Sequence, residues 1–138
     1  MNHRRLLLVI DDEEIVREAI EDILESVNIA VISAADGYEG ISLFKQHQSE
    51  IKGILLDMKM PGLSGSETLK QLRTIDPNIT VILSSGYSEE ETRRSLANQM
   101  PIRFLPKPYN FDTLVENVKK VMDEDEDEST EVQAAREL

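Results

Sequence analysis

The chain alternates between short, largely apolar runs and longer segments in which apolar residues recur every three or four positions. Continuous apolar runs of this length indicate strands that are buried on both faces of a sheet. One of them ends abruptly in a single carboxylate, Asp57. The predicted strands are residues 5–10, 29–33, 51–56, 79–84 and 102–105.

The segments after these strands predict helices, each with one buried apolar stripe. Ile15 belongs to the stripe of the first helix and Phe111 to that of the last, so both are expected to face the core. The two stripes consist of Ile15, Val16, Ala19, Ile20, Ile23, Leu24 and Val27, and of Phe111, Leu114, Val115, Val118 and Met122.

Capping residues mark the starts of the helices. Asp or Ser followed three positions later by Glu is the pattern of a capping box, whose side chains bind free N–H groups of the first turn. The predicted caps are Asp36 with Glu39, Ser64 with Glu67, Ser88 with Glu91, and Asn110 alone, so the second helix is expected over 37–48 and the fourth as far as about residue 98.

Strand and helix thus alternate five times with short connections. This order predicts a parallel sheet with helices on both faces and right-handed crossovers. Five units favour an open, doubly wound sheet over an eight-unit barrel. The fold class is α/β, with a compact domain expected over residues 3–122 and an acidic tail or linker over 123–138.

The composition excludes several kinds of site and binding partner. The chain has 138 residues, a net charge of −12 and no cysteine, which excludes a disulfide, a thiolate zinc site and a cysteine nucleophile. Eight acidic residues and one arginine give residues 123–138 a charge of −7, and no basic patch for nucleic acid occurs. No apolar stretch approaches the roughly 18 residues that cross a membrane. We expect a cytoplasmic protein that binds neither nucleic acid nor membrane.

Polar groups stand at the ends of the predicted strands: the pair Asp11 and Asp12, then Asp57, Ser85 and Lys107. Singly, each has an ordinary explanation as a cap, a turn residue or a surface lysine. In an open parallel sheet, however, the carboxyl ends of the strands lie along one edge, where ligands bind. We therefore expect these residues to share one pocket.

Three carboxylates in one pocket require a cation. Each close pair repels by about 4 kcal/mol at an effective dielectric constant of 20. An all-oxygen cluster suits Mg²⁺, or Mn²⁺, better than zinc. An Asp beside a divalent ion and Lys107 is suited to forming an aspartyl phosphate, since phosphoryl transfer depends mainly on positioning and charge neutralisation.

Four motifs, VIDDEE, LLDMKMPG, ILSSGYS and FLPKPY, occur in the order and with the spacing of a known family. Over about residues 3–122 the chain resembles the receiver domain of two-component response regulators, including those attached to hybrid histidine kinases. The resemblance implies a flavodoxin-like (βα)5 fold with strand order 2-1-3-4-5.

The resemblance also implies individual roles. Asp57 would be the phosphoacceptor and a metal ligand. Asp11 and Asp12 would hold Mg²⁺, with Asp12 the direct ligand and Asp11 acting partly through water, and the carbonyl of Lys59 would complete the protein ligands. Ser85 would be the switch hydroxyl, and Lys107 would bind the phosphoryl group.

Four more positions follow from the resemblance. Gly86 would leave room beside the phosphoryl group, and Tyr87 would flank it. Phe104 stands at the family's switch-aromatic position, although it equally suits a core phenylalanine. The bond between Lys107 and Pro108 is expected to be cis.

The function implied is a phosphorylation-operated switch rather than an enzyme with a separate substrate. It would catalyse its own phosphorylation, by a sensor histidine kinase or a phosphotransfer protein, and its own dephosphorylation. Output would pass to a downstream protein, or to a second copy in a homodimer, through the face made by the fourth helix, fifth strand and last helix. The chain would be a stand-alone protein or one module of a larger one.

Two other classes stay open. A phosphatase of the haloacid dehalogenase type also forms an aspartyl phosphate, but it would need a second Asp at the position of Lys59. The other is a receiver that binds partners without phosphorylation, which the intact set of site residues disfavours. A nucleotide-binding P-loop is absent from the sequence.

Lys59 and Tyr87 each lie two residues beyond a site residue, where long side chains would overhang the phosphoryl group and obstruct the attacking water. We predict that Lys59→Asn and Tyr87→Ala shorten the lifetime of the phosphorylated protein. Decay followed by intact mass measures this, and unchanged rates in both variants would contradict the idea.

Overall fold

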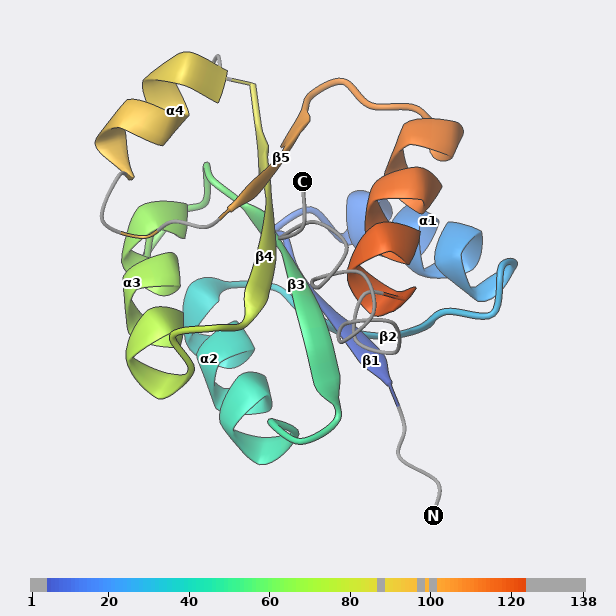
Figure 1. The fold of residues 1–138 in the computed structure, drawn as a ribbon, viewed down its shortest axis with the longest axis horizontal. Helices are drawn as coiled ribbons and strands as arrows, with labels where there is room; N and C mark the ends of the chain where they lie inside the picture. Colours follow the sequence, from blue (N-terminus) through green and yellow to red (C-terminus); the bar gives the residue numbers. More distant parts are fainter. Residues whose placement is uncertain (1–4, 87–88, 97–98, 100–101, 124–138) are drawn as a thin grey trace, which may run out of the picture.

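The fold is that of a five-stranded parallel sheet, seen in a computed structural model that describes residues 5–86, 89–96, 99 and 102–123 (Figure 1). The strand order is β2-β1-β3-β4-β5, which confirms the predicted doubly wound topology. The strands are β1 (Leu6–Ile10), β2 (Ala30–Ala34), β3 (Ile51–Asp57), β4 (Thr80–Ser85) and β5 (Arg103–Pro106).

Helices cover both faces of the sheet (Figure 1). Side chains of α2 and α3 pack with alternate residues of the strands on one face, and α1 packs on the other face with a C-terminal helix over 111–123. The labelled helices are α1 (Glu14–Glu25), α2 (Gly37–Gln46), α3 (Gly65–Ile75) and α4 (Glu89–Ser95). None of the helices in the described part of the chain is long and apolar enough to cross a membrane.

The strands lie within one residue of their predicted ends. β2, β3, β4 and β5 each end one residue later than the apolar pattern indicates. Backbone pairing, rather than side-chain polarity, sets these ends: Ala34 pairs with Ile10, and Ser85 pairs with Pro106. Polar residues at the edge of the sheet therefore still belong to the strands.

Three of the four predicted caps lie in described residues. The Asp36 side chain accepts a hydrogen bond from the Glu39 N–H, and Ser64 with Glu67 forms a full capping box. Asn110 accepts from the Thr113 N–H at 2.8 Å. Ser88 lies outside the described residues, as does the predicted end of the fourth helix at residue 98; α4 ends at Ser95.

Three core predictions are wrong. Ile15 is 82 % exposed and Phe111 is 48 % exposed, and both lie in the first turn of their helix, where the predicted stripe begins. Ala19 is also exposed. The other residues of the two stripes are buried or half-buried, with Ile20, Leu24 and Leu114 among the buried ones.

Candidate functional site

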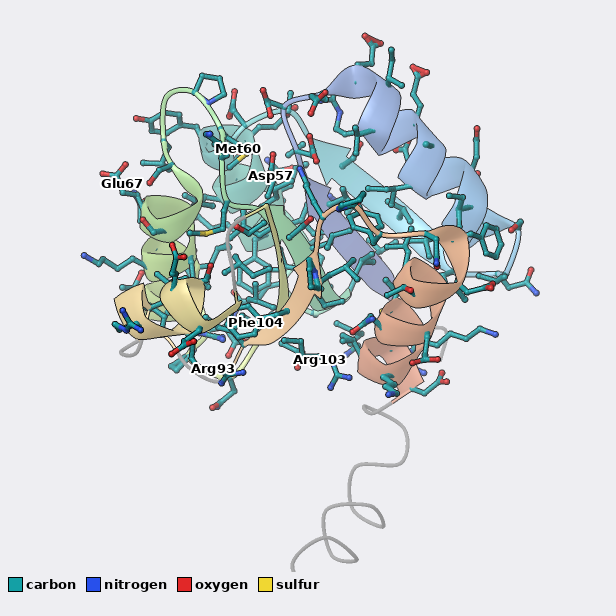
Figure 2. The ribbon with its side chains drawn as sticks, turned by 90° about the horizontal axis from the view of Figure 1, so that it is seen from above. Asp57, Met60, Glu67, Arg93, Arg103 and Phe104 are labelled. Carbon is teal, nitrogen blue, oxygen red and sulfur yellow. The ribbon has the colours of Figure 1, made fainter. Side chains whose placement is uncertain are left out.

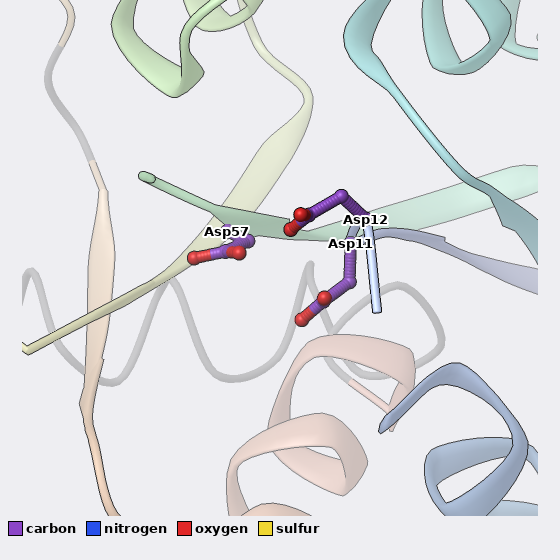
Figure 3. Close-up of side chains that lie close together, drawn as sticks. All are labelled: Asp11, Asp12 and Asp57. Atoms are coloured by element: carbon purple, nitrogen blue, oxygen red, sulfur yellow. The ribbon is translucent and has the colours of Figure 1, made fainter. Parts of the chain in front are cut away.

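Three acidic side chains meet at the carboxyl edge of the sheet. One carboxylate oxygen each from Asp11, Asp12 and Asp57 lies within 4.8 Å of the others (Figure 3). Asp11 and Asp57 are buried at 4 % exposure, whereas Asp12 is exposed. The fold thus brings together the acidic residues that the sequence placed at the ends of the first and third strands.

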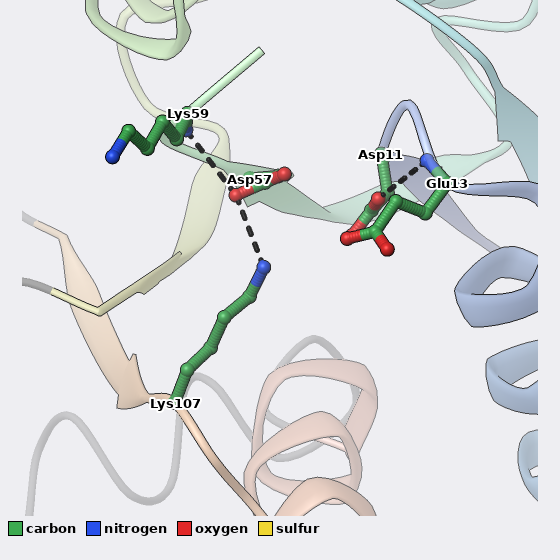
Figure 4. Close-up of polar contacts among 5 residues, drawn as sticks. All are labelled: Asp11, Glu13, Asp57, Lys59 and Lys107. Carbon is green, nitrogen blue, oxygen red and sulfur yellow. Dashed lines mark hydrogen bonds and ion pairs between the residues drawn. The ribbon is translucent and has the colours of Figure 1, made fainter.

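Asp11 closes the turn between β1 and α1. Its N–H donates to the Ala34 carbonyl at 3.1 Å, which continues the pairing with β2. Its Oδ1 accepts from the Glu13 N–H at 2.9 Å (Figure 4). Its carbonyl accepts from the Arg17 guanidinium at 2.8 Å. The side chain is therefore held by the start of the helix that follows it.

Asp57 meets two positively polarised groups at the same oxygen. Its Oδ1 accepts from the Lys59 N–H at 3.2 Å and pairs with the Lys107 Nζ at 3.3 Å (Figure 4). The Lys107 N–H donates to the Ser85 carbonyl at 3.0 Å, and its peptide bond to Pro108 is cis. The long side chain of Lys59 leads away from the Asp57 carboxylate in Figure 4.

The loop after Asp57 depends on a glycine. Gly65 begins α3, and its N–H donates to the Met58 carbonyl at 3.1 Å. A Cβ at Gly65 would lie 2.5 Å from the Met58 Cα and 2.7 Å from the Asp57 carbonyl oxygen. Because both neighbours are backbone atoms, only glycine lets the helix approach the end of β3 this closely.

Burial and repulsion act on this cluster. Burial raises the pKa of Asp11, the hydrogen bond from Glu13 opposes this, and the charge of Asp57 adds to it. Lys107 offsets only part of the negative charge. Binding of a further cation would therefore lower the electrostatic free energy of the cluster.

The donor set fits a hard divalent ion. It consists of carboxylates, one of them exposed, and Mg²⁺ prefers oxygen ligands and commonly keeps several waters. Mn²⁺ accepts the same ligands. Coordination of the metal ion by the Lys59 carbonyl, which the family resemblance implies, stays a prediction.

Two predicted site residues lie at the end of β4. Ser85 is buried at 6 % exposure, on the opposite sheet face from its neighbour Ser84 because successive residues of a strand alternate. Gly86 is exposed, and a Cβ there would meet nothing within 4 Å. Tyr87 lies outside the described residues.

Phe104 is half-buried and packs against the core under α2 and α3. The Arg93 guanidinium of α4 lies 4.8 Å from the centre of its ring, a cation–π contact (Figure 2). The core and switch interpretations of Phe104 are thus compatible, since the ring belongs to the core and contacts Arg93 of α4.

Tyr109 was not singled out from the sequence as a site residue. Burial and the charges of Asp11 and Asp57 raise the pKa of Tyr109 to about 12, with Ser84 opposing the shift. Strand alternation could have placed Ser84 on the Asp57 side, but only the fold brings Tyr109 there.

A groove runs between α1 and the C-terminal helix, with a volume of about 630 Å³. Its lining is mainly apolar and includes the two exposed residues Ile15 and Phe111. Tyr109 and Lys107 line its inner end. An apolar groove therefore reaches the lysine that contacts Asp57.

Comparison with known proteins agrees with this geometry. Residues 7–119 match the family described as the response regulator receiver domain. The chain is 28 % identical over 116 residues to sporulation initiation phosphotransferase F of Bacillus subtilis, covering 84 % of this chain and 92 % of that protein. It is 32 % identical over 117 residues to sensor kinase CckA of Brucella abortus, covering 85 % of this chain but only 12 % of the kinase.

A solved receiver domain protein from Clostridium thermocellum superposes with a TM-score of 0.80 at 27 % identity, covering 88 % of this chain and 97 % of that one. The fold and the match over residues 7–119 define a two-component signalling module of flavodoxin-like architecture. The chain belongs to the response regulator receiver domain family.

Replacement of Asp11 by Asn tests the electrostatics. The raised pKa means that the unfolded chain ionises Asp11 at a lower pH than the folded chain does, so stability falls as the pH rises through that window. At neutral pH without metal, we expect Asp11→Asn to unfold at a higher temperature than the parent. The amide keeps the oxygen that accepts from Glu13.

With Mg²⁺ present, we expect the parent instead to unfold at a higher temperature than Asp11→Asn. A ligand at 100 times its Kd stabilises the folded state by about 2.7 kcal/mol, and the variant has one carboxylate fewer to bind it. Asp12→Asn is the matched control: it removes a charge from the same cluster, but from an exposed residue, so its metal-free gain should be smaller. Thermal unfolding with and without Mg²⁺ measures both effects. Equal metal-free gains in the two variants would contradict the role of burial.

Proposed function

We propose that the chain is a phosphorylation-operated switch that accepts a phosphoryl group on Asp57 from a phosphohistidine. The observation that carries this proposal is the position of Asp57. Its buried carboxylate lies against Lys107 at 3.3 Å and within reach of two further carboxylates. A nucleophile, a cation and a metal-binding set therefore converge on one point.

In the proposed step, a carboxylate oxygen of Asp57 attacks phosphorus as the bond from phosphorus to the imidazole nitrogen breaks. The imidazole leaves with that electron pair. Lys107 turns from the carboxylate to an oxygen of the transferred group, and the Ser85 hydroxyl donates to another. Bound Mg²⁺, held by Asp11, Asp12 and Asp57, would supply neutralisation of the phosphoryl charge.

Movement of Ser85 and Lys107 toward the new dianion provides the switch. Their backbones are joined by the 3.0 Å hydrogen bond from the Lys107 N–H to the Ser85 carbonyl, so β4 and β5 shift together. Phe104 lies on β5 and meets Arg93 of α4, which couples the shift to the output face. A downstream protein, or a second copy of the chain, would bind the favoured conformation.

The apolar groove between α1 and the C-terminal helix suits the docking of the donor. Its rim carries Ile15 and Phe111, and its inner end carries Lys107 beside the phosphoacceptor. An amphipathic helix that presents a phosphohistidine could bury apolar residues here while its histidine faces Asp57. Donors of this kind include sensor histidine kinases and phosphotransfer proteins.

The rival functions receive less support. A haloacid dehalogenase-type phosphatase would need an acid two residues after Asp57, where the exposed Lys59 stands. A receiver that never accepts phosphoryl would not need Asp57 and Lys107 in contact. The chain spans most of the phosphotransferase relative but a small part of the sensor kinase, so both a stand-alone switch and a kinase module are compatible with it.

Phosphoryl uptake tests the proposal directly. With Mg²⁺ and acetyl phosphate, we expect intact mass to increase by one phosphoryl group, and we expect no increase for Asp57→Asn. Lys107→Ala should lose at least about tenfold in rate, the equivalent of 1.4 kcal/mol, because one cation no longer meets the transferred group. Uptake by Asp57→Asn at the parent rate would exclude Asp57 as the acceptor.

Docking in the groove predicts a different pattern. Ile15→Lys and Phe111→Lys should each slow transfer from a phosphorylated donor protein by about tenfold or more, since each loses an apolar contact worth roughly 1.5–3 kcal/mol when buried. Uptake from acetyl phosphate should stay at the parent rate. The matched control is Tyr38→Lys, at an exposed aromatic on α2, which should change neither rate. Parent-like transfer in both groove variants would place donor docking elsewhere.

A further inference from the structure

Ser84 carries a buried hydroxyl that needs an explanation. The residue is 2 % exposed, and its Oγ makes no hydrogen bond of normal geometry in the described structure, although the Tyr109 hydroxyl interacts with it. Leaving a buried hydroxyl unpaired costs about 1–3 kcal/mol, so such groups are rare in folded proteins and often have a role. Alanine at this position would avoid the cost.

The register of the sheet places Ser84 beside the phosphoacceptor. Ser84 pairs with Asp57 across β3 and β4, and the Met58 N–H donates to the Ser84 carbonyl at 3.0 Å. Residues that pair in a parallel sheet point to the same face. On that face, Ile82 of β4 and Leu55 of β3 pack in the core under α1, so Ser84 and Asp57 share the α1 side.

Tyr109 brings a second hydroxyl to the same place. Its ring packs in the core under α1 and lines the inner end of the groove. Its hydroxyl interacts with Ser84, and burial together with the charges of Asp11 and Asp57 raises its pKa to about 12. Tyr109 is therefore a protonated donor at neutral pH that can reach the buried hydroxyl of Ser84.

We propose that Ser84 and Tyr109 are positioning residues that together orient the Asp57 carboxylate for attack on phosphorus. This inference rests on the proposed phosphoacceptor function. Lys59 and Lys107 both contact Oδ1, and rotation about the bond to the carboxylate is intrinsically loose. A hydroxyl pair on the neighbouring strand and the next loop would restrict that rotation from the α1 side.

The physical effect lies in the geometry of attack rather than in binding. Phosphoryl transfer needs the attacking oxygen in line with the leaving group, and small misplacements cost up to about 100-fold in rate. Ser84 and Tyr109 act through one another, since Tyr109 can donate to the Ser84 Oγ while Ser84 donates onward to the carboxylate. Loss of either hydroxyl should therefore remove most of the effect.

The test uses Ser84→Ala, Tyr109→Phe and the double variant, with acetyl phosphate as donor and Mg²⁺ present. We expect each single variant to lose about tenfold in the maximal uptake rate with the donor concentration for half-maximal rate unchanged. The double variant should be little slower than either single one. Ser84→Thr, which keeps the hydroxyl, should restore most of the rate, and Tyr38→Phe, an exposed tyrosine, should match the parent.

Two further measurements separate positioning from other causes. Mg²⁺ affinity by calorimetry should stay within twofold of the parent in every variant, and the unfolding temperature should not fall in parallel with the rate. Parent-like rates in both single variants, a loss of Mg²⁺ affinity equal to the loss of rate, or no rescue by Ser84→Thr would each overturn the inference. Uptake by the parent together with parent-like variants rejects this inference alone, whereas no uptake by the parent rejects the proposed function as well.

Discussion

The main constraint on the structure is the repulsion between two carboxylates, Asp11 and Asp57, that lie close together at the end of a hydrophobic core. Both are 4 % exposed, and their charges repel across a few ångströms. The stabilising contacts are local: a helix-start N–H for Asp11, and a loop N–H with Lys107 for Asp57. These contacts leave net negative charge in the pocket, and this charge favours the binding of cations.

The fold tolerates this repulsion because the two carboxylates lie at the edge of the sheet, next to its most buried strands. β1 and β3 lie in the interior of the sheet, and most of their residues are apolar and buried. The stability gained from this burial offsets the stability lost by the repulsion at the acidic edge. The same close packing holds the strand ends in fixed positions. The glycine at 65 extends this precision into the following loop by letting α3 contact the backbone of Asp57.

Much of this architecture was predictable because local sequence patterns determine its strands and helices. Apolar runs followed by Asp57 or by Asp11 and Asp12 identify both the strands and the acidic edge, and parallel topology then requires these ends to meet. Ile15 and Phe111 show the limit: helical periodicity assigns them to a buried stripe, but only the finished fold reveals that they stay exposed and line a groove between two helices. Ser84 and Tyr109 could not be paired from the sequence either, because their proximity depends on the path of the chain after Pro108.

Tyr109 belongs to two functional surfaces at once. Its ring lines the apolar groove, while the charges of Asp11 and Asp57 raise the pKa of its hydroxyl. An occupant of the groove would therefore touch a residue that interacts electrostatically with the proposed phosphoacceptor, and docking and chemistry would share a side chain. Ser84 is buried under the sheet edge and Ile15 lies on the outer rim, so substitutions at these two positions separate the two effects that a change at Tyr109 would combine.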